Sequence, residues 1–178
     1  MPKRRSISRP STRYSDGRGN IRFSFQLSPV MKGKTMPYRF LEDIAIADIA
    51  FEAWGKTREE MFMAAADALM NVMVADQTTI RTVEEVEFRL EEQPLDMLLF
   101  NFLGELIFYK DARPLLLRVT WVTIIPTGSH FSLTAAAGGE RPDPARHPLT
   151  VDVKAVTLHH FRVEETADGW RAEVVLDI

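Results

Sequence analysis

Apolar and polar residues alternate along several stretches of the chain, which is the pattern of β-strands that bury one face. The first stretch covers residues 39–53. At its end Ile49, Phe51 and Ala53 stand at every second position. In a second stretch, 84–91, acids alternate with valine, phenylalanine and leucine. The same alternation, bounded by turn residues, predicts further strands over 115–125, 130–137, 151–163 and 170–177.

Two other segments repeat their apolar residues every three to four positions, which predicts helices. The first begins at a capping box, in which Thr57 is followed three residues later by Glu60, and its helical spacing continues to about Val74. The second helix is expected over residues 95–109. Its wide apolar stripe consists of Leu98, Leu99, Phe102, Leu103, Leu106 and Ile107.

The expected elements follow one another in the order β-α-β-α-β-β-β-β, with no internal repeat. Turn residues at 126–128 and 167–169 join the last four strands into two hairpins. Residues 138–148, which are rich in glycine and proline, predict a loop between these hairpins. We therefore expect an α+β fold, a two-layer α/β sandwich in which two helices pack on one face of a mixed β-sheet.

The net charge of −3 is distributed unevenly over the 178 residues. Residues 1–35 contain nine Lys or Arg and one acid, a net charge of +8, whereas residues 36–178 contain thirteen Lys or Arg and twenty-four acids, a net charge of −11. Residues 1–35 have few apolar anchors, so we expect a disordered leader or an upstream-start extension, the alternative being a basic arm with its own partner. The folded domain is then 36–178. Its acidity argues against strong direct nucleic-acid binding and suits a cation or a basic partner protein.

Composition and motifs exclude several classes of protein. The chain has no cysteine, which excludes disulfide scaffolds and thiolate sites and fits a reducing, cytoplasmic location. No apolar run reaches the roughly 18–20 residues of a membrane helix, and no signal peptide follows the basic start. Glycine-rich phosphate loops, His-Glu-x-x-His and Gly-x-Ser-x-Gly do not occur. A Ser/His/Asp triad stays open, but the chain is poorly equipped as an enzyme.

Asp48 and Asp177 are candidate ligands of a hard cation. Asp48 lies inside an otherwise apolar strand, and Asp177 stands next to the free α-carboxylate of Ile178. If the first strand pairs with the last, these three carboxylates form an all-oxygen site, which suits Ca²⁺, Mg²⁺ and Mn²⁺ alike. The alternative interpretations place Asp48 on the wet face of its strand and Asp177 at a solvated terminus.

Five further residues are weaker candidates. In the glycine-rich loop, Glu140 could ligate a metal and Arg141 could hold a carboxylate or phosphate, with His147 nearby. Lys154 and His159 are polar insertions in an apolar strand, and a period of two directs His159 away from Lys154. The alternatives are solvated loop residues and a structural histidine.

Several of these segments, taken in order, resemble the archease family. Residues 48–57 are similar to its opening, an Ala-Asp followed by an apolar strand, an aromatic-Gly pair and a threonine cap. Residues 59–69 resemble its first helix and residues 98–106 its second. The resemblance covers about residues 38–178. The remaining blocks that carry it are Gly138-Gly139-Glu140, Val153-Lys154-Ala155-Val156-Thr157 with His159, and the terminal Leu176-Asp177-Ile178.

The resemblance implies an accessory protein of the RtcB-type RNA ligase. This ligase joins a 2′,3′-cyclic-phosphate or 3′-phosphate end to a 5′-hydroxyl in tRNA splicing and RNA repair, using GTP and a divalent metal. Archeases promote guanylylation of the ligase's active-site histidine and restore it for further turnovers, with no separate reaction of their own. The family's metal site maps here onto Asp48, Asp177 and the carboxylate of Ile178. One departure is that Ala45 and Ile46 stand where many archeases carry His-Thr.

Two other functions stay open at the level of sequence. A chaperone-like binding module would expose an apolar patch of Trp54, Phe100 and Phe102, which otherwise belong to the core. A small metal-dependent phosphoester or nucleotide hydrolase would use Asp48, Glu140, His159 and Asp177.

Overall fold

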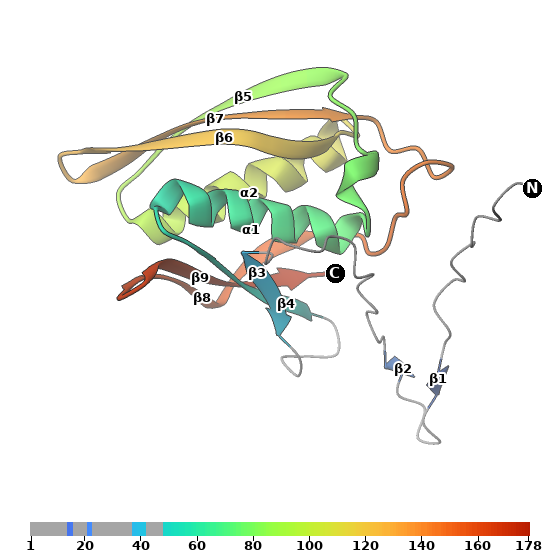
Figure 1. Ribbon diagram of the computed structural model, residues 1–178, viewed down its shortest axis with the longest axis horizontal. Coiled ribbons are helices and arrows are strands. Elements are labelled where there is room, and N and C mark those ends of the chain that lie inside the picture. Colours follow the sequence, from blue (N-terminus) through green and yellow to red (C-terminus); the bar gives the residue numbers. More distant parts are fainter. Residues whose placement is uncertain (1–13, 16–20, 23–36, 42–47) are drawn as a thin grey trace, which may run out of the picture. The chain divides into compact units, whose positions relative to one another are not determined.

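The computed structural model describes residues 14–15, 21–22, 37–41 and 48–178 (Figure 1). The chain divides into two compact units, Met1–Lys34 and Thr35–Ile178. In the first unit β1 (Tyr14–Ser15) pairs with β2 (Ile21–Arg22) in antiparallel orientation. Apart from β1 and β2, residues 1–35, which the sequence predicts to be disordered, lie outside the described residues.

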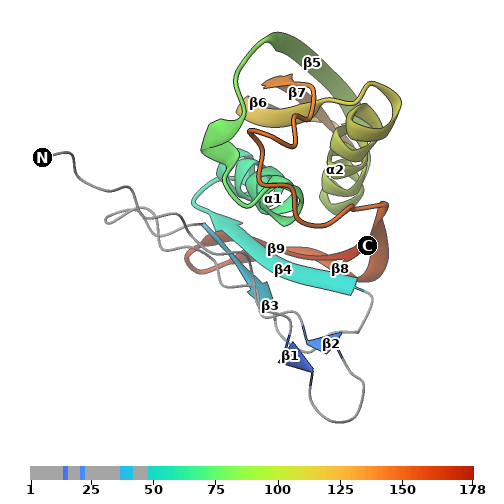
Figure 2. The ribbon, with the colours of Figure 1, turned by 90° about the vertical axis from the view of Figure 1, so that its right-hand side faces the viewer.

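The second unit has three layers, with both helices lying between two antiparallel sheets (Figures 1 and 2). One sheet has the strand order β3-β4-β9-β8 and the other β5-β7-β6. The strands are β3 (Tyr38–Leu41), β4 (Asp48–Gly55), β5 (Glu84–Glu92), β6 (Leu116–Thr127), β7 (His130–Glu140), β8 (Ala155–Thr166) and β9 (Gly169–Asp177). The helices are α1 (Arg58–Met73), α2 (Leu95–Ala112) and the short 3-10 helix η1 (Gln77–Thr79).

The α+β class expected from the sequence is confirmed, and the arrangement of the sheets is corrected. In the second unit, the described strands form two separate sheets instead of a single one, and every pairing within them is antiparallel instead of mixed. The reason lies in α1, which is apolar around most of its circumference and therefore needs cover on both sides. Its buried residues are Met61, Phe62, Ala64, Ala65, Ala66, Ala68, Leu69, Met70, Val72 and Met73.

The expected capping box at the start of α1 is present. Thr57 Oγ1 accepts a hydrogen bond from the backbone N–H of Glu60, and the Glu60 side chain accepts one from the backbone N–H of Lys56. Gly55 precedes this cap because a Cβ there would lie 2.5 Å from the backbone nitrogen of Met61. The cap therefore fixes where β4 ends and α1 begins.

The aromatic core fills the space between the layers. The Phe102 ring lies 6.0 Å from that of Phe62 and 5.8 Å from that of Phe88, and its side chain is 0% exposed. Phe100 is partly buried and packs edge-on against Phe161. Of the three residues that a chaperone-like module would expose, only Trp54 is exposed, so these residues do not form an exposed apolar patch.

The boundaries of the last hairpins differ from the predicted ones. The predicted loop starts at Gly138, yet β7 continues to Glu140. Glycine at position 139 lets β7 approach β6 closely, since a Cβ there would lie only 2.0 Å from the Leu116 carbonyl oxygen. From sequence alone, a glycine that permits close approach of two strands looks the same as a glycine in a loop. At the other end of the connection, β8 begins at Ala155 rather than at 151.

None of the helices in the described residues is long and apolar enough to cross a membrane.

Candidate functional site

Asp48 and Asp177 lie opposite each other on neighbouring strands. Asp48 opens β4, Asp177 closes β9, and the two residues are register partners in the antiparallel pair. The condition on which the predicted site depends, pairing of this strand with the last one, is thereby met. Directly opposed residues place their Cβ atoms roughly 4.5–5.5 Å apart, so the two carboxylates are close enough to share a cation.

Strand alternation directs both aspartates away from the helices. Ile49 and Phe51 in β4, and Val174 and Leu176 in β9, belong to the core or pack against it. Since successive side chains alternate across a strand, Asp48 and Asp177 lie on the outer face of the four-stranded sheet. Both are partly exposed.

Lys154 holds the C-terminal residue beside this pair. Its backbone N–H donates to the Asp177 carbonyl, and its Nζ donates to the main-chain oxygen of Ile178, both at 2.9 Å. Lys154 precedes β8, whose first residue, Ala155, is the register partner of Asp177. The predicted supporting residue Lys154 therefore contacts the terminal carboxylate directly.

The paired aspartates place two carboxylates side by side at one end of the sheet. No basic side chain among the described residues forms an ion pair with Asp48 or Asp177, and like charges directly opposed across a sheet are destabilising. A cation bound between them would remove this repulsion. The donors are all oxygens, the set that Ca²⁺ and Mg²⁺ prefer.

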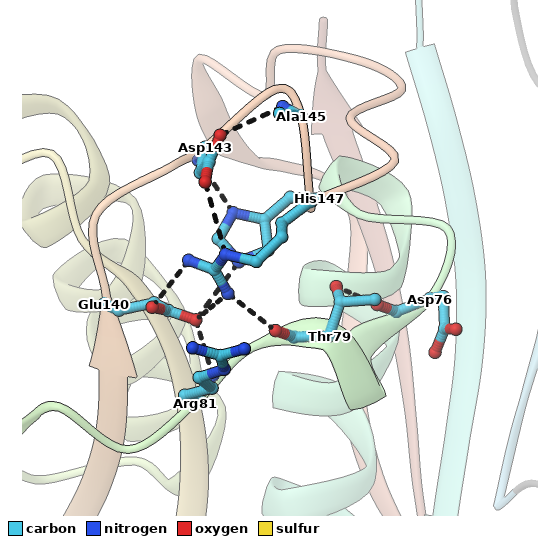
Figure 3. Close-up of polar contacts among 8 residues, drawn as sticks. Asp76, Thr79, Arg81, Glu140, Asp143, Ala145 and His147 are labelled. Carbon is cyan, nitrogen blue, oxygen red and sulfur yellow. Dashed lines mark hydrogen bonds and ion pairs between the residues drawn. The ribbon is translucent and has the colours of Figure 1, made fainter.

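Glu140 lies in the other sheet and serves a different purpose. Its side chain is buried, and its two oxygens accept hydrogen bonds from Nη1 and Nη2 of Arg146, both at 2.8 Å (Figure 3). Oε1 also accepts from the backbone N–H of Arg81 at 2.8 Å. His147 Nδ1 accepts from the backbone N–H of Asp143, which leaves Nε2 as the donor toward Glu140 at 3.2 Å. Glu140 thus anchors the connection between β7 and β8.

The pKa of Glu140 reflects these contacts. The Arg146 guanidinium, followed by the backbone N–H of Arg81, lowers the pKa of Glu140 to about 2. The carboxylate is therefore ionised, and both of its oxygens accept hydrogen bonds within the protein. Arg146, rather than the predicted Arg141, is the basic residue that pairs in this loop.

The lowered pKa gives a pH-dependent contribution to stability. A carboxyl with a depressed folded-state pKa stabilises the fold above its ordinary value of 4.5, and this contribution is lost as the pH falls through about 2. We expect the unfolding temperature of wild type to exceed that of Glu140→Gln at pH 5 and above, and the difference to shrink toward pH 2. Thermal unfolding followed by circular dichroism over pH 2–7 measures this. A difference that is constant across that range would contradict it.

His159 does not join the paired aspartates. The register of β8 with β9 shifts between Thr157 and Arg162, so the simple alternation expected for this strand is interrupted. His159 lies in this irregular segment, is exposed, and packs its ring against that of His160. No group of three or more His, Asp or Glu side chains that could hold a metal occurs in the described part of the chain, so Glu140 and His159 do not complete the proposed hydrolase site.

Sequence reasoning missed Arg146 and Arg81. Arg146 is one of many charged residues in a polar loop, and Arg81 contributes a backbone N–H that any residue except proline could supply. No local spacing signals either contact. Ala45 and Ile46 fall in 42–47, outside the described residues.

The second unit is an α+β domain whose core strands bring two aspartates together beside the C-terminus. The archease protein family (MTH1598/TM1083) matches residues 38–178, and the chain belongs to this family. It is 37% identical over 149 residues to protein archease of Methanosarcina barkeri, covering 83% of this chain and 100% of that protein. It is 40% identical over 134 residues to protein archease of Pyrococcus abyssi, covering 74% and 93%.

Solved structures agree with this fold. The solution structure of Methanobacterium thermoautotrophicum protein 1598 superposes with a TM-score of 0.70 at 30% identity, covering 81% of this chain and 100% of that one. A crystal structure from Thermotoga maritima, described as an archease and possible chaperone, gives a TM-score of 0.51 at 21% identity, covering 74% and 91%. The latter supports the fold alone.

Proposed function

We propose that this chain is a metal-binding accessory factor that stimulates guanylylation and repeated turnover of an RtcB-type RNA ligase. It would act in the cytoplasm, in tRNA splicing or RNA repair. The observation that carries the proposal is the alignment of Asp48 with Asp177 beside the terminal carboxylate, in a chain of the archease family.

The cation would be held by Asp48, Asp177 and the carboxylate of Ile178, and would be Ca²⁺, Mg²⁺ or Mn²⁺. A cation held there would supply positive charge to offset the phosphates of GTP during guanylylation of the ligase. Lys154 keeps the terminal carboxylate in place through its 2.9 Å contact with Ile178. The acidic end of β4 and β9 would be the part of this chain that faces the ligase.

A protein partner fits this domain better than RNA does. Residues 36–178 carry a net charge of −11, which repels the phosphate backbone of nucleic acid. The chemistry of RNA joining would then belong to the ligase, and the role of this chain would be to prepare the ligase for reaction. Nucleotide or phosphoester turnover by this chain alone, lost in Asp48→Ala, would instead favour a hydrolase.

A ligation assay tests the proposal. An RtcB-type ligase is held at limiting concentration with GTP, divalent metal and RNA bearing a 3′-phosphate and a 5′-hydroxyl, with and without this chain. The proposal expects several ligations per ligase molecule only when this chain is present. Equal product in both reactions would contradict it.

Removal of residues 1–35 is expected to leave this stimulation unchanged. The family match begins at residue 38, and all three candidate ligands belong to the second unit. A chain that starts at Met36 should therefore give the same number of turnovers as the full chain in the same assay. A loss of stimulation, with the thermal unfolding midpoint preserved, would assign the basic leader a part in binding the ligase.

A further inference from the structure

The outer face of the three-stranded sheet, the side away from the helices, has an uneven surface. In the central strand β7, Leu133 and Ala135 are buried, so the small residues Ser132, Thr134 and Ala136 alternate with them onto the outer face. Figure 1 shows this sheet with both helices on its other side. A row of small residues between two strands with longer side chains forms a shallow trough.

Two adjoining depressions lie on the β5 side of this trough, between Arg89 and the β6–β7 turn. The larger has a volume of about 570 Å³, the smaller about 140 Å³, and both are bordered by Glu91 and Ser132. The smaller one reaches Thr127 and His130 beside the β6–β7 turn. The trough therefore runs along β7 toward that turn.

The β6 wall of the trough exposes large apolar side chains. Trp121 is 44% exposed and Ile125 is 57% exposed. In the strand register Trp121 stands beside Ala136, and Ile125 beside Ser132. Trp121 and Ile125 are therefore the large apolar side chains that this face offers to a partner.

The β5 wall is acidic. Glu87 stands beside Ala136, and Glu91 beside Ser132, so each of these two small residues separates an acid from an apolar side chain. Between them, Thr134 separates Arg89 from Thr123. The Glu87–Ala136–Trp121 row and the Glu91–Ser132–Ile125 row are roughly 13 Å apart along the strands.

The basic groups near this wall neutralise only part of it. Arg89 is hydrogen-bonded to Glu87, whereas no basic side chain of the described residues pairs with Glu91. Arg118 lies across Gly138 from Glu85 and marks the far end of the acidic stretch. The open negative charge is therefore greatest around Glu91.

We propose that this trough binds a cationic segment of a partner polypeptide. A Lys or Arg of the segment would pair with Glu91, and its aliphatic or aromatic side chains would pack on Trp121 and Ile125. Nucleic acid does not match an acidic wall, and the folded body of a second copy, with its charge of −11, is repelled. Asp48 and Asp177 belong to the other sheet, so the proposal is independent of cation binding there.

Peptide titration of the ¹⁵N-labelled full chain tests this surface. The probe is an acetylated peptide of alternating arginine and leucine, and the comparison probe replaces every arginine with glutamate. The proposal expects amide signals of β5, β6 and β7 to shift with the cationic peptide alone. Shifts centred on the other sheet, or shifts with both peptides, would overturn it.

Matched variants separate specific docking from general attraction of opposite charges. We expect Glu91→Lys and Trp121→Ser each to weaken peptide binding at least about tenfold. Glu165→Lys, which changes the same charge at an exposed position of the other sheet, should leave the affinity unchanged. Equal losses in Glu91→Lys and Glu165→Lys would overturn the proposal. So would stronger binding of a labelled oligouridylate, or a dimer that Trp121→Ser dissociates in sedimentation equilibrium.

Discussion

Replacing Asp48 with Asn is expected to abolish tight binding of a divalent cation. The substitution keeps the size of the side chain and removes one of the two negative charges that face each other at the ends of β4 and β9. Loss of a partner that only orients a metal ligand costs roughly 10–100-fold in affinity, so loss of a ligand should cost more. Isothermal titration calorimetry with Ca²⁺, Mg²⁺ and Mn²⁺ measures the change.

Asp168→Asn is the matched control for this experiment. Asp168 is exposed in the turn between β8 and β9, at the opposite end of the same sheet, so its loss changes the net charge equally. It should bind the cation as wild type does. Wild-type affinity in the Asp48→Asn chain, with an unchanged circular dichroism spectrum, would show that the cation binds elsewhere or not at all.

Replacing Phe102 with Ala is expected to produce the largest loss of stability. Its ring is fully buried between Phe62 and Phe88, and removal of a buried phenylalanine costs about 3–5 kcal/mol. In a chain of this length each kcal/mol lowers the unfolding temperature by about 2–4 °C, so a decrease on the order of 10 °C follows. Differential scanning calorimetry measures it.

Phe108→Ala is the comparison, since Phe108 lies on the same helix and is 56% exposed. Its unfolding temperature should fall much less. If Phe102→Ala unfolded at the wild-type temperature, Phe102 would instead belong to an exposed patch of the kind that a chaperone-like module needs.

The alignment of Asp48 with Asp177 was accessible from sequence because two independent signals converge. A single acid interrupts an apolar strand, and another acid closes the last strand next to a free carboxylate. Their pairing still required the assumption that these strands are neighbours, since alternation describes a strand and not its partner. The register supplies that missing step.

The two-sheet arrangement and the role of Glu140 were less accessible. Burial around most of α1 shows that it is covered on both sides, but alanines such as Ala64 and Ala68 are compatible with either a half-covered or a fully covered helix. Glu140 binds the backbone N–H of Arg81, 59 residues away in the chain. Contacts of this kind depend on the tertiary fold, and no residue spacing along the chain encodes them.

The decisive experiment follows guanylylation of an RtcB-type ligase by labelled GTP at limiting ligase. We expect stimulation by wild type and by Asp168→Asn. We expect no stimulation by Asp48→Asn, or by a chain extended beyond Ile178 so that the terminal carboxylate moves away from Asp177. Full stimulation by a folded Asp48→Asn chain would contradict the proposed role of the paired aspartates.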